Sequence, residues 1–143
     1  ASIPPYWAAD FEDMTRRMGD PRTPEGRKLL ADRSPLTRAA AIKKPLLIGQ
    51  GKNDPRVKQA EADQIVSAMQ KNHIPVTYAL YPDEGHGFAR AENKKSFNAV
   101  MEIFLAQCLG GSYQPIGNDF AGSSITVPVG KNEIFSLATS SAP

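Results

Sequence analysis

Two short apolar runs that flank one amphipathic segment constrain the fold of this chain more than any other feature. Residues 45–51 (PLLIGQG) are too short for a helix and lack polar alternation, which is typical of a parallel strand buried on both faces. Residues 75–81 (PVTYALY) are rich in Val, Thr, Tyr and Leu, which favours a second strand. Because apolar residues recur at helical spacing between the two runs, we predict a strand, a helix and a strand.

This order places the ends of both strands on one edge of a sheet. A strand, a crossover helix and a second strand in one sheet give parallel neighbours, whose following loops leave from the carboxyl edge. Asp54 lies in the first loop and His86 in the second. Adjacent strands are about 5 Å apart, so the two side chains can meet where open α/β sheets bind ligands. The helix residues expected to face the sheet are Val57, Ala60 or Glu61, Gln64 or Ile65, Ala68 and Met69, with Lys58, Asp63, Gln70 and Lys71 turned away.

A carboxylate beside an imidazole is two thirds of a nucleophilic triad. The carboxylate fixes the tautomer of the ring, and the imidazole takes a proton from a hydroxyl and later returns it to the leaving group. Gly85 and Gly87 on either side of His86 leave the backbone free to aim the ring. We therefore predict Asp54 as the acid and His86 as the base of such a triad.

Both residues also have a purely structural interpretation. Asp54 precedes Pro55, and this pair is typical of an N-cap followed by the first residue of a helix. A histidine between two glycines is commonly a turn residue. Asp83 and Glu84 could compete as acids, but they lie on the histidine's own loop, where we expect them to be solvated. The position of His86 directly after the second strand favours the catalytic interpretation of the pair.

At these residues the chain resembles a known family. The motif GKNDPRV at 51–57, followed after a helix and a strand by YPDEGHGF at 81–88, is similar to the C-terminal end of the peptidase domain of the prolyl oligopeptidase family. These serine peptidases include dipeptidyl and acylaminoacyl peptidases, and the resemblance covers residues 3–109. It implies that Asp54 is the triad acid, that His86 is the triad base, and that Arg56 holds a substrate carbonyl.

The resemblance also implies a nucleophile that this chain does not carry. In α/β-hydrolases the serine precedes the acid and the histidine in the chain and lies in a G-x-S-x-G turn. No such turn precedes Asp54, and residues 110–114 (GGSYQ) lack the final glycine and follow His86. We therefore expect an α/β fold that is the C-terminal fragment of an α/β-hydrolase, with its last two parallel strands and flanking helices. The chain alone is expected to be catalytically incomplete.

Hydrolysis of short peptides by acyl transfer is the function that the resemblance implies. The expected partners are a short peptide substrate and the remaining N-terminal part of the same enzyme, which carries the serine and a β-propeller. An esterase or dienelactone hydrolase type of α/β-hydrolase is an alternative, because such enzymes end with a similar order of acid, helix, strand and histidine. A non-catalytic interaction module of the same fold is a third interpretation.

Composition argues against several other classes. The 143 residues are 41% hydrophobic and 22% charged, which is ordinary for one globular domain. A net charge of +2 without a basic stripe does not indicate nucleic-acid binding, and nothing in the sequence indicates a membrane span. One cysteine excludes an internal disulfide, and two histidines with one cysteine do not suit a zinc site, so we expect no metal and no cofactor. The sequence leaves the cellular compartment open.

The flanking segments complete the expected organisation. Residues 1–111 are assigned to the peptidase domain and residues 112–143 to a C-terminal extension. Further helices are expected at 6–18, 24–31 and 92–109, with a short connector at 36–42. Tyr6 and Trp7 belong either to the core or to a substrate pocket.

The last predicted helix and the extension carry two more expectations. Residues 92–109 are expected to cover the sheet with one apolar face, on which Cys108 is an inert core residue. In the extension, residues 125–129 and 134–137 form either a hairpin or one strand packed on the main body. The face expected to be buried in the helix comprises Phe97, Val100, Met101, Phe104, Leu105 and Cys108.

Overall fold

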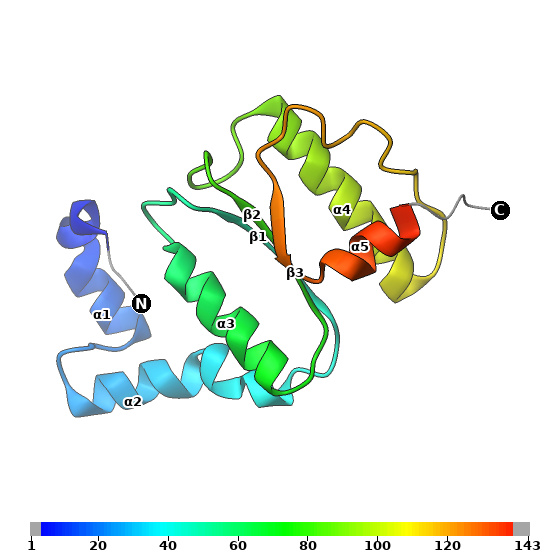
Figure 1. The fold of residues 1–143 in the computed structure, drawn as a ribbon. Helices are drawn as coiled ribbons and strands as arrows, with labels where there is room; N and C mark the ends of the chain where they lie inside the picture. Colours follow the sequence, from blue (N-terminus) through cyan, green and yellow to red (C-terminus); the bar gives the residue numbers. More distant parts are fainter. Residues whose placement is uncertain (1–3, 139–143) are drawn as a thin grey trace.

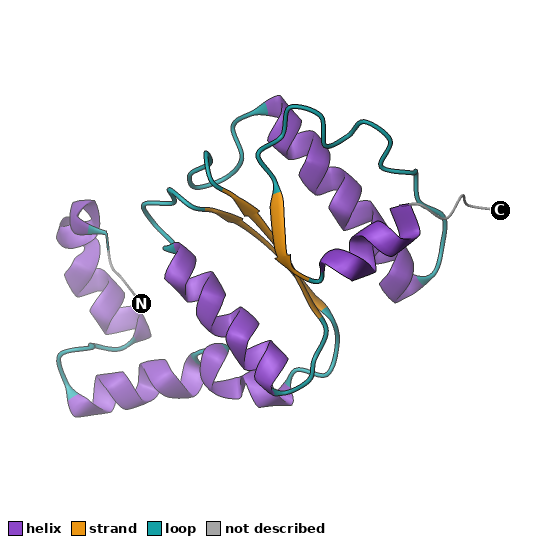
Figure 2. Ribbon diagram, in the orientation of Figure 1, coloured by secondary structure: helices purple, strands orange, loops and turns teal. Residues whose placement is uncertain are grey.

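The computed structural model describes residues 4–138 and shows a small sheet between helices (Figure 1). The predicted α/β class is therefore confirmed, and strands and helices alternate along most of the chain (Figure 2). Helix α3 lies on one side of the sheet, and α4 and α5 lie on the other (Figure 1). The elements in chain order are the 3₁₀ helix η1 (Pro5–Asp10), α1 (Phe11–Met18), α2 (Pro24–Arg33), the 3₁₀ helix η2 (Leu36–Ala41), β1 (Leu46–Gly51), α3 (Gln59–Lys71), β2 (Val76–Tyr81), α4 (Ala91–Leu109), β3 (Thr126–Val129) and α5 (Lys131–Ala138).

The sheet has the strand order β1-β2-β3. Strands β1 and β2 are parallel, in a register that runs from Leu46 opposite Val76 to Gly51 opposite Tyr81, as predicted for a crossover unit. β1 therefore lies at an edge of the sheet formed by the described residues. Its apolar residues are only half-buried and Gly49 is exposed, so the expected complete burial of this strand on both faces is wrong for the described residues.

Strand β2 is the central strand and separates two hydrophobic clusters. Alternate side chains of a strand point to opposite faces of the sheet. Val76 and Tyr78 pack against α3, whereas the Tyr81 hydroxyl on the other face meets Ser96 of α4. The cluster on the first face contains Ala62, Val66, Met69, Val76 and Tyr78, and the cluster around α4 and α5 contains Val100, Ile103, Ile116 and Ile134.

The buried face of α3 matches the predicted one only in part. Met69 is buried and Ile65 packs against the hydrophobic cluster, as predicted. The helix begins at Gln59, so Val57 lies in the preceding turn and is exposed. The helical repeat of apolar residues was counted from Val57, which is not in the helix. The predicted face is therefore rotated about the helix axis relative to the observed one. Asp63, expected to point away, accepts a hydrogen bond from the Tyr78 hydroxyl at 3.1 Å. The residues of α3 that are buried are Ala62, Val66 and Met69.

Helix α4 has nearly the predicted bounds, but its buried face matches the predicted one only in part. Val100 is buried, as predicted. Asn93 and Ser96 are fully buried, together with Val100 and Ile103. Hydrophobicity alone did not identify this face, because buried polar residues are stable when their hydrogen bonds are satisfied. The prediction that Cys108 belongs to the core is wrong, since this residue is exposed. Met101 and Leu105, also expected on the buried face, are exposed as well.

The segment after α4 returns to the sheet. Strand β3 pairs antiparallel with β2, with Val129 opposite Tyr78 and Thr126 opposite Leu80, so the single strand of the two alternatives is observed. Residues 134–137, the second predicted strand, instead belong to α5. Gly130 allows the sharp turn between β3 and α5, because its φ is +78° and a Cβ there would lie 2.7 Å from the Val76 carbonyl oxygen. Residues 139–143 of the predicted extension lie outside the described residues.

The N-terminal helices follow the predicted order. The expected helix over 6–18 is divided into η1 and α1, and α2 begins with Pro24 after a Thr23 cap that accepts the Gly26 N–H at 3.0 Å. Tyr6 is exposed and Trp7 is half-buried, with their rings 6.1 Å apart in an edge-to-face arrangement. Within residues 4–138, no helix combines the length and the apolar character that crossing a membrane requires.

Candidate active site

Two loops at the carboxyl edge of the sheet form the candidate site. Residues 52–58 follow β1 and residues 82–90 follow β2. Because the parallel register ends with Gly51 opposite Tyr81, both loops leave the sheet at the same level. Both lie on the edge of the sheet that ligands occupy in open α/β folds.

The structure brings Asp54 and His86 together across these loops. His86 Nδ1 lies 2.9 Å from Asp54 Oδ2. The aspartate side chain is 8% exposed and the histidine side chain is 47% exposed. The carboxylate is therefore shielded from water, while the ring it contacts remains accessible from outside.

Asp54 uses its second oxygen to shape its own loop. Oδ1 accepts the backbone N–H groups of Arg56 at 2.8 Å and Val57 at 2.9 Å. Since α3 starts at Gln59, with Lys58 as its N-cap, Asp54 does not cap that helix. The alternative interpretation of Asp54 as a helix cap is therefore wrong.

The ionisation of Asp54 fixes the tautomer of His86. Burial alone raises the pKa of the Asp54 carboxyl, but hydrogen bonds from the Val57 N–H, the His86 ring and the Arg56 N–H outweigh burial and hold the pKa below its usual value. An ionised carboxylate only accepts hydrogen bonds, so Nδ1 must donate its proton to Oδ2. In the neutral ring Nε2 then has no proton and can act as a base.

Direct hydrogen bonds hold the two loops together. The Lys52 N–H donates to the Tyr81 carbonyl at 2.9 Å, and the Asn53 N–H donates to the Glu84 carbonyl at 2.9 Å. The Asn53 side-chain amide adds a third bond, to the Pro82 carbonyl at 2.9 Å. Asn53 thus joins the loop of the acid to the loop of the base through both its backbone and its side chain.

Glu84 is the main site residue whose environment was predicted wrongly. It is 2% exposed rather than solvated. Its carboxylate accepts the N–H groups of Ala89 at 2.8 Å and Arg90 at 3.0 Å, and the side-chain amide of Asn93 at 2.8 Å. Burial raises the pKa of Glu84, but these hydrogen bonds lower it more, and the pKa lies below its usual value. Because both oxygens are engaged at the start of α4, Glu84 does not compete with Asp54 for His86.

Asp83 is also engaged elsewhere. Its carboxylate contacts the Ser124 hydroxyl, the Arg90 guanidinium and, at 3.0 Å, the Asn93 amide. The Ser124 hydroxyl and these other donors hold the pKa of Asp83 below its usual value, although burial opposes them. An acidic residue shortly before a predicted helix is a signal for an interaction with the helix start, and this signal could have identified Glu84 from the sequence.

Aromatic packing fixes the far end of the histidine loop. The Phe88 ring lies 4.3 Å from the Tyr81 ring and 5.2 Å from the Phe97 ring, centroid to centroid. Gly49 of β1 leaves room for this packing, since a Cβ there would lie 2.6 Å from the Phe97 ring. The loop is thus held before His86 by hydrogen bonds and after it by aromatic rings packed in tilted and edge-to-face arrangements.

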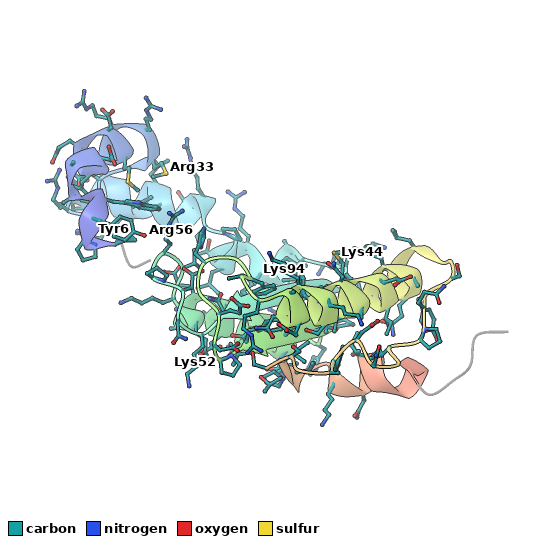
Figure 3. All side chains as sticks on the ribbon, turned by 90° about the horizontal axis from the view of Figure 1, so that it is seen from above. Tyr6, Arg33, Lys44, Lys52, Arg56 and Lys94 are labelled. Carbon is teal, nitrogen blue, oxygen red and sulfur yellow. The ribbon has the colours of Figure 1, made fainter. Side chains whose placement is uncertain are left out.

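Arg56, the third predicted site residue, has an exposed side chain. Its backbone N–H binds Asp54. Figure 3 shows the side chain on the side of the molecule that faces the N-terminal helices, in the direction of Tyr6. The structure therefore places Arg56 near the acid without a role in orienting the histidine. Within residues 4–138, no group of three or more His, Cys, Asp or Glu side chains is arranged to hold a metal ion.

Comparisons with known proteins place this chain in a family. The fold is that of an α/β-hydrolase peptidase domain, of which the chain covers a part. A sequence model of the prolyl oligopeptidase family matches residues 6–112, which is more than half of the chain. The chain belongs to the prolyl oligopeptidase family.

Two curated relatives match most of the chain. It is 70% identical over 138 residues to the dipeptidyl aminopeptidase BIII of Pseudoxanthomonas mexicana. This alignment covers 96% of this chain and 20% of that protein. It is 53% identical over 115 residues to dipeptidyl peptidase family member 6 of Caenorhabditis elegans. This alignment covers 80% of this chain and 16% of that protein. The chain thus spans at most about a fifth of the length of these two relatives.

Two solved structures also resemble the chain. A puromycin-hydrolyzing peptidase of Mycobacterium tuberculosis has a TM-score of 0.61 and 29% identity, over 63% of this chain and 14% of its own. A puromycin hydrolase has a TM-score of 0.62 and 27% identity, over 73% of this chain and 17% of its own.

The close approach of the two loops predicts the effect of a single methyl group. A Cβ at Gly51 would lie 2.2 Å from the Gly85 carbonyl oxygen and 2.7 Å from the Glu84 carbonyl oxygen. We expect Gly51→Ala to lower the free energy of unfolding by about 1–3 kcal/mol, as overpacking does in protein interiors, measured by denaturant titration. Gly85→Ala is the matched control, since a methyl group there meets only the Asn53 carbonyl oxygen at 3.9 Å. Equal effects of the two substitutions would contradict the close approach.

The buried carboxylate of Glu84 should make the free energy of unfolding fall in acid. Its pKa is held below the usual 4.5 in the folded state, so the unfolded chain binds more protons as the pH falls. Its contribution is present in full above about pH 4.5 and is lost as the pH falls through the folded pKa. We expect Glu84→Gln to lower the free energy of unfolding by about 1–3 kcal/mol at pH 7 and by progressively less below pH 4, measured by denaturant titration at each pH.

A matched control separates this effect from the general consequences of removing a charge. Glu25 lies in the first turn of α2 and is exposed. We expect Glu25→Gln to change the free energy of unfolding by less than about 0.5 kcal/mol. A Glu84→Gln effect of the same size at pH 7 and pH 3 would contradict the assigned role.

Proposed function

We propose that this chain supplies the acid and the base of the catalytic triad of a serine peptidase. The observation that carries the proposal is the 2.9 Å hydrogen bond between His86 Nδ1 and Asp54 Oδ2 at the carboxyl edge of the sheet. Membership of the prolyl oligopeptidase family supports it, as does the 70% identity to a dipeptidyl aminopeptidase. The nucleophilic serine and the oxyanion hole lie on a part of the enzyme outside these 143 residues.

The geometry supports a separate role for each of the two residues. Asp54 keeps the proton of His86 on Nδ1, so Nε2 is free to take the proton of the serine hydroxyl as the oxygen attacks the peptide carbonyl. Asp54 stabilises the imidazolium that forms. The imidazolium gives its proton to the leaving amine as the peptide bond breaks, which leaves an acyl-enzyme. Water, activated by the same Nε2, then releases the acyl group and restores the serine.

Short peptides are the proposed substrates, and release of dipeptides is the proposed specificity. The two relatives named dipeptidyl peptidases are 70% and 53% identical to this chain. Acylamino-acid-releasing enzymes from rat and human are 30% and 32% identical and match only half of it. A β-propeller preceding the peptidase domain, as the family resemblance implies, would restrict access to short chains.

Arg56 is proposed to hold a substrate carbonyl. Its exposed side chain leaves from the same turn as Asp54, so it is positioned by the two backbone hydrogen bonds that Asp54 accepts. A guanidinium group carries several N–H donors in a fixed plane and can donate to a carbonyl oxygen of a bound peptide.

One test of the proposed function concerns the acid. In the full-length protein that carries this chain, we expect Asp54→Asn to lower kcat by about 10⁴ with little change in KM, by analogy with the worked serine triad. The amide removes the negative charge and allows the wrong tautomer of His86. The measurement is steady-state hydrolysis of a dipeptidyl anilide. Asp32→Asn, at an exposed position of α2, is the matched control and should retain full activity.

A loss smaller than about tenfold in Asp54→Asn would remove Asp54 from the mechanism. Labelling the parent full-length protein with a fluorophosphonate shows whether its serine is reactive, and so whether the protein is an active hydrolase at all. A full-length protein whose serine is not labelled would instead favour a non-catalytic module of the same fold.

Another test concerns Arg56. We expect Arg56→Met to raise KM for a dipeptidyl anilide about tenfold or more, because a hydrogen bond from a charged donor is lost, while kcat changes less. Lys52→Met, which removes an exposed cation from the same loop, is the matched control and should leave KM unchanged. Equal increases of KM in the two variants would mean that substrate binding depends on net charge alone, which would contradict the proposed contact of Arg56 with a substrate carbonyl.

A further inference from the structure

Asn93 joins the histidine loop to the C-terminal segment. It lies in the first turn of α4 and is fully buried. Its amide nitrogen donates to Glu84 Oε1 at 2.8 Å and to Asp83 Oδ1 at 3.0 Å. Its amide oxygen accepts the Ser123 hydroxyl at 2.9 Å and the Ser124 N–H at 3.0 Å. One side chain therefore uses its donors on the loop and its acceptor on a segment about thirty residues further along the chain.

Other contacts make the same connection. The Ser124 hydroxyl donates to Asp83, and the Arg90 guanidinium contacts Asp83 and donates to the Gly122 carbonyl at 3.0 Å. Ser123 Oγ lies 2.8 Å from Ser96 Oγ. Among the described residues, no buried side-chain nitrogen or oxygen lacks a hydrogen-bond partner. Glu84, Asn93 and Ser96 are the buried members of this network, whereas Asp83 and Arg90 are exposed. Buried polar groups whose hydrogen bonds are all satisfied make the surrounding structure rigid.

Residues 122–124, which we call the brace, lie beyond residue 112, where the match to the family model ends. In Figure 1 the brace passes the start of α4 and leads into β3. β3 then pairs with β2, the strand that leads into the histidine loop, with Thr126 opposite Leu80. The brace is thus attached to the loop at one end and continuous with the sheet at the other.

His86 itself has few contacts that fix its position. It is flanked by two glycines, and Gly87 has a φ of +86°, a conformation that glycine adopts without strain. Its ring is half exposed and bonds Asp54 through one nitrogen. The position of the ring therefore depends on how firmly the neighbouring residues of the loop are held.

We infer that Asn93 is a positioning residue for His86, acting through the brace and the carboxylates of Asp83 and Glu84. The inference rests on the proposed function of His86 as the base. A displacement of about 1 Å in a catalytic group can lower the rate about a hundredfold without changing the binding of the substrate. Loss of the Asn93 connection should therefore lower kcat and leave KM almost unchanged.

The primary test is Asn93→Asp in the full-length protein. This substitution keeps the shape and the oxygen that faces the brace, but it replaces the amide donor with an oxygen aimed at two carboxylates. We expect kcat for a dipeptidyl anilide to fall about 10- to 100-fold, with KM within about threefold of the parent. Asn98→Asp is the matched control, because Asn98 is exposed on the same helix and gains the same charge. It should retain its kcat.

The second test changes the brace and not the helix. Ser124→Ala removes the hydroxyl that donates to Asp83, and we expect kcat to fall several-fold, by about the effect of one hydrogen bond. Ser124→Thr keeps a hydroxyl and should restore kcat. If Asn93→Asp does not fold, Ser124→Ala and Ser124→Thr together test the positioning role.

The outcomes separate the two proposals. Loss of kcat at constant KM in Asn93→Asp and in Ser124→Ala, with a parent-like kcat in Ser124→Thr, supports the positioning role. Parent-like kcat in both Asn93→Asp and Ser124→Ala, beside an inactive Asp54→Asn, overturns the positioning role and leaves the proposed function intact. A kcat that falls only in proportion to the unfolded fraction also overturns it. An active Asp54→Asn overturns the proposed function and this inference with it.

Discussion

The parallel register of β1 and β2 is the constraint on which the site depends. Because Gly51 lies opposite Tyr81, the two strands end at the same level, and the loops that follow them are in contact. A side chain at Gly51 would collide with the carbonyl oxygens of Glu84 and Gly85, so the contact requires glycine there. Three hydrogen bonds from Lys52 and Asn53 then fix the loop of the acid on the end of β2 and on the histidine loop. The distance between Asp54 and His86 follows from this arrangement.

Buried polar groups hold the site in place, in addition to the apolar core. Glu84 and Asn93 are almost completely buried, yet each oxygen and nitrogen of their side chains has a partner. Removing one member would leave the others without partners in a region of low dielectric, which costs more than the bond itself contributes. This dependence ties the histidine loop, the start of α4 and residues 122–124 into one unit. The hydrophobic clusters on the two faces of the sheet stabilise the strands and helices that carry this unit.

The sequence predicted the features that depend on local pattern. The apolar runs at 45–51 and 75–81 identified the two parallel strands, and the strand order placed Asp54 near His86. The sequence did not reveal Asn93, because its partners Ser123 and Ser124 are about thirty residues away and a buried asparagine has no hydrophobic signature. The buried face of α3 was predicted only in part, for a different reason. The turn closed by the Asp54 carboxylate delays the start of the helix to Gln59, and no periodicity records that delay.

The tautomer of His86 tests the central claim most directly. Nitrogen-15 NMR of histidine-labelled full-length protein distinguishes a proton on Nδ1 from a proton on Nε2 in the neutral ring, and His86→Asn assigns the signal. We expect the proton on Nδ1, in a strong hydrogen bond to Asp54, with Nε2 free to act as a base. The signal should change to a mixture of tautomers in Asp54→Asn. A neutral His86 that carries its proton on Nε2 in the parent protein would contradict the proposed pairing of acid and base.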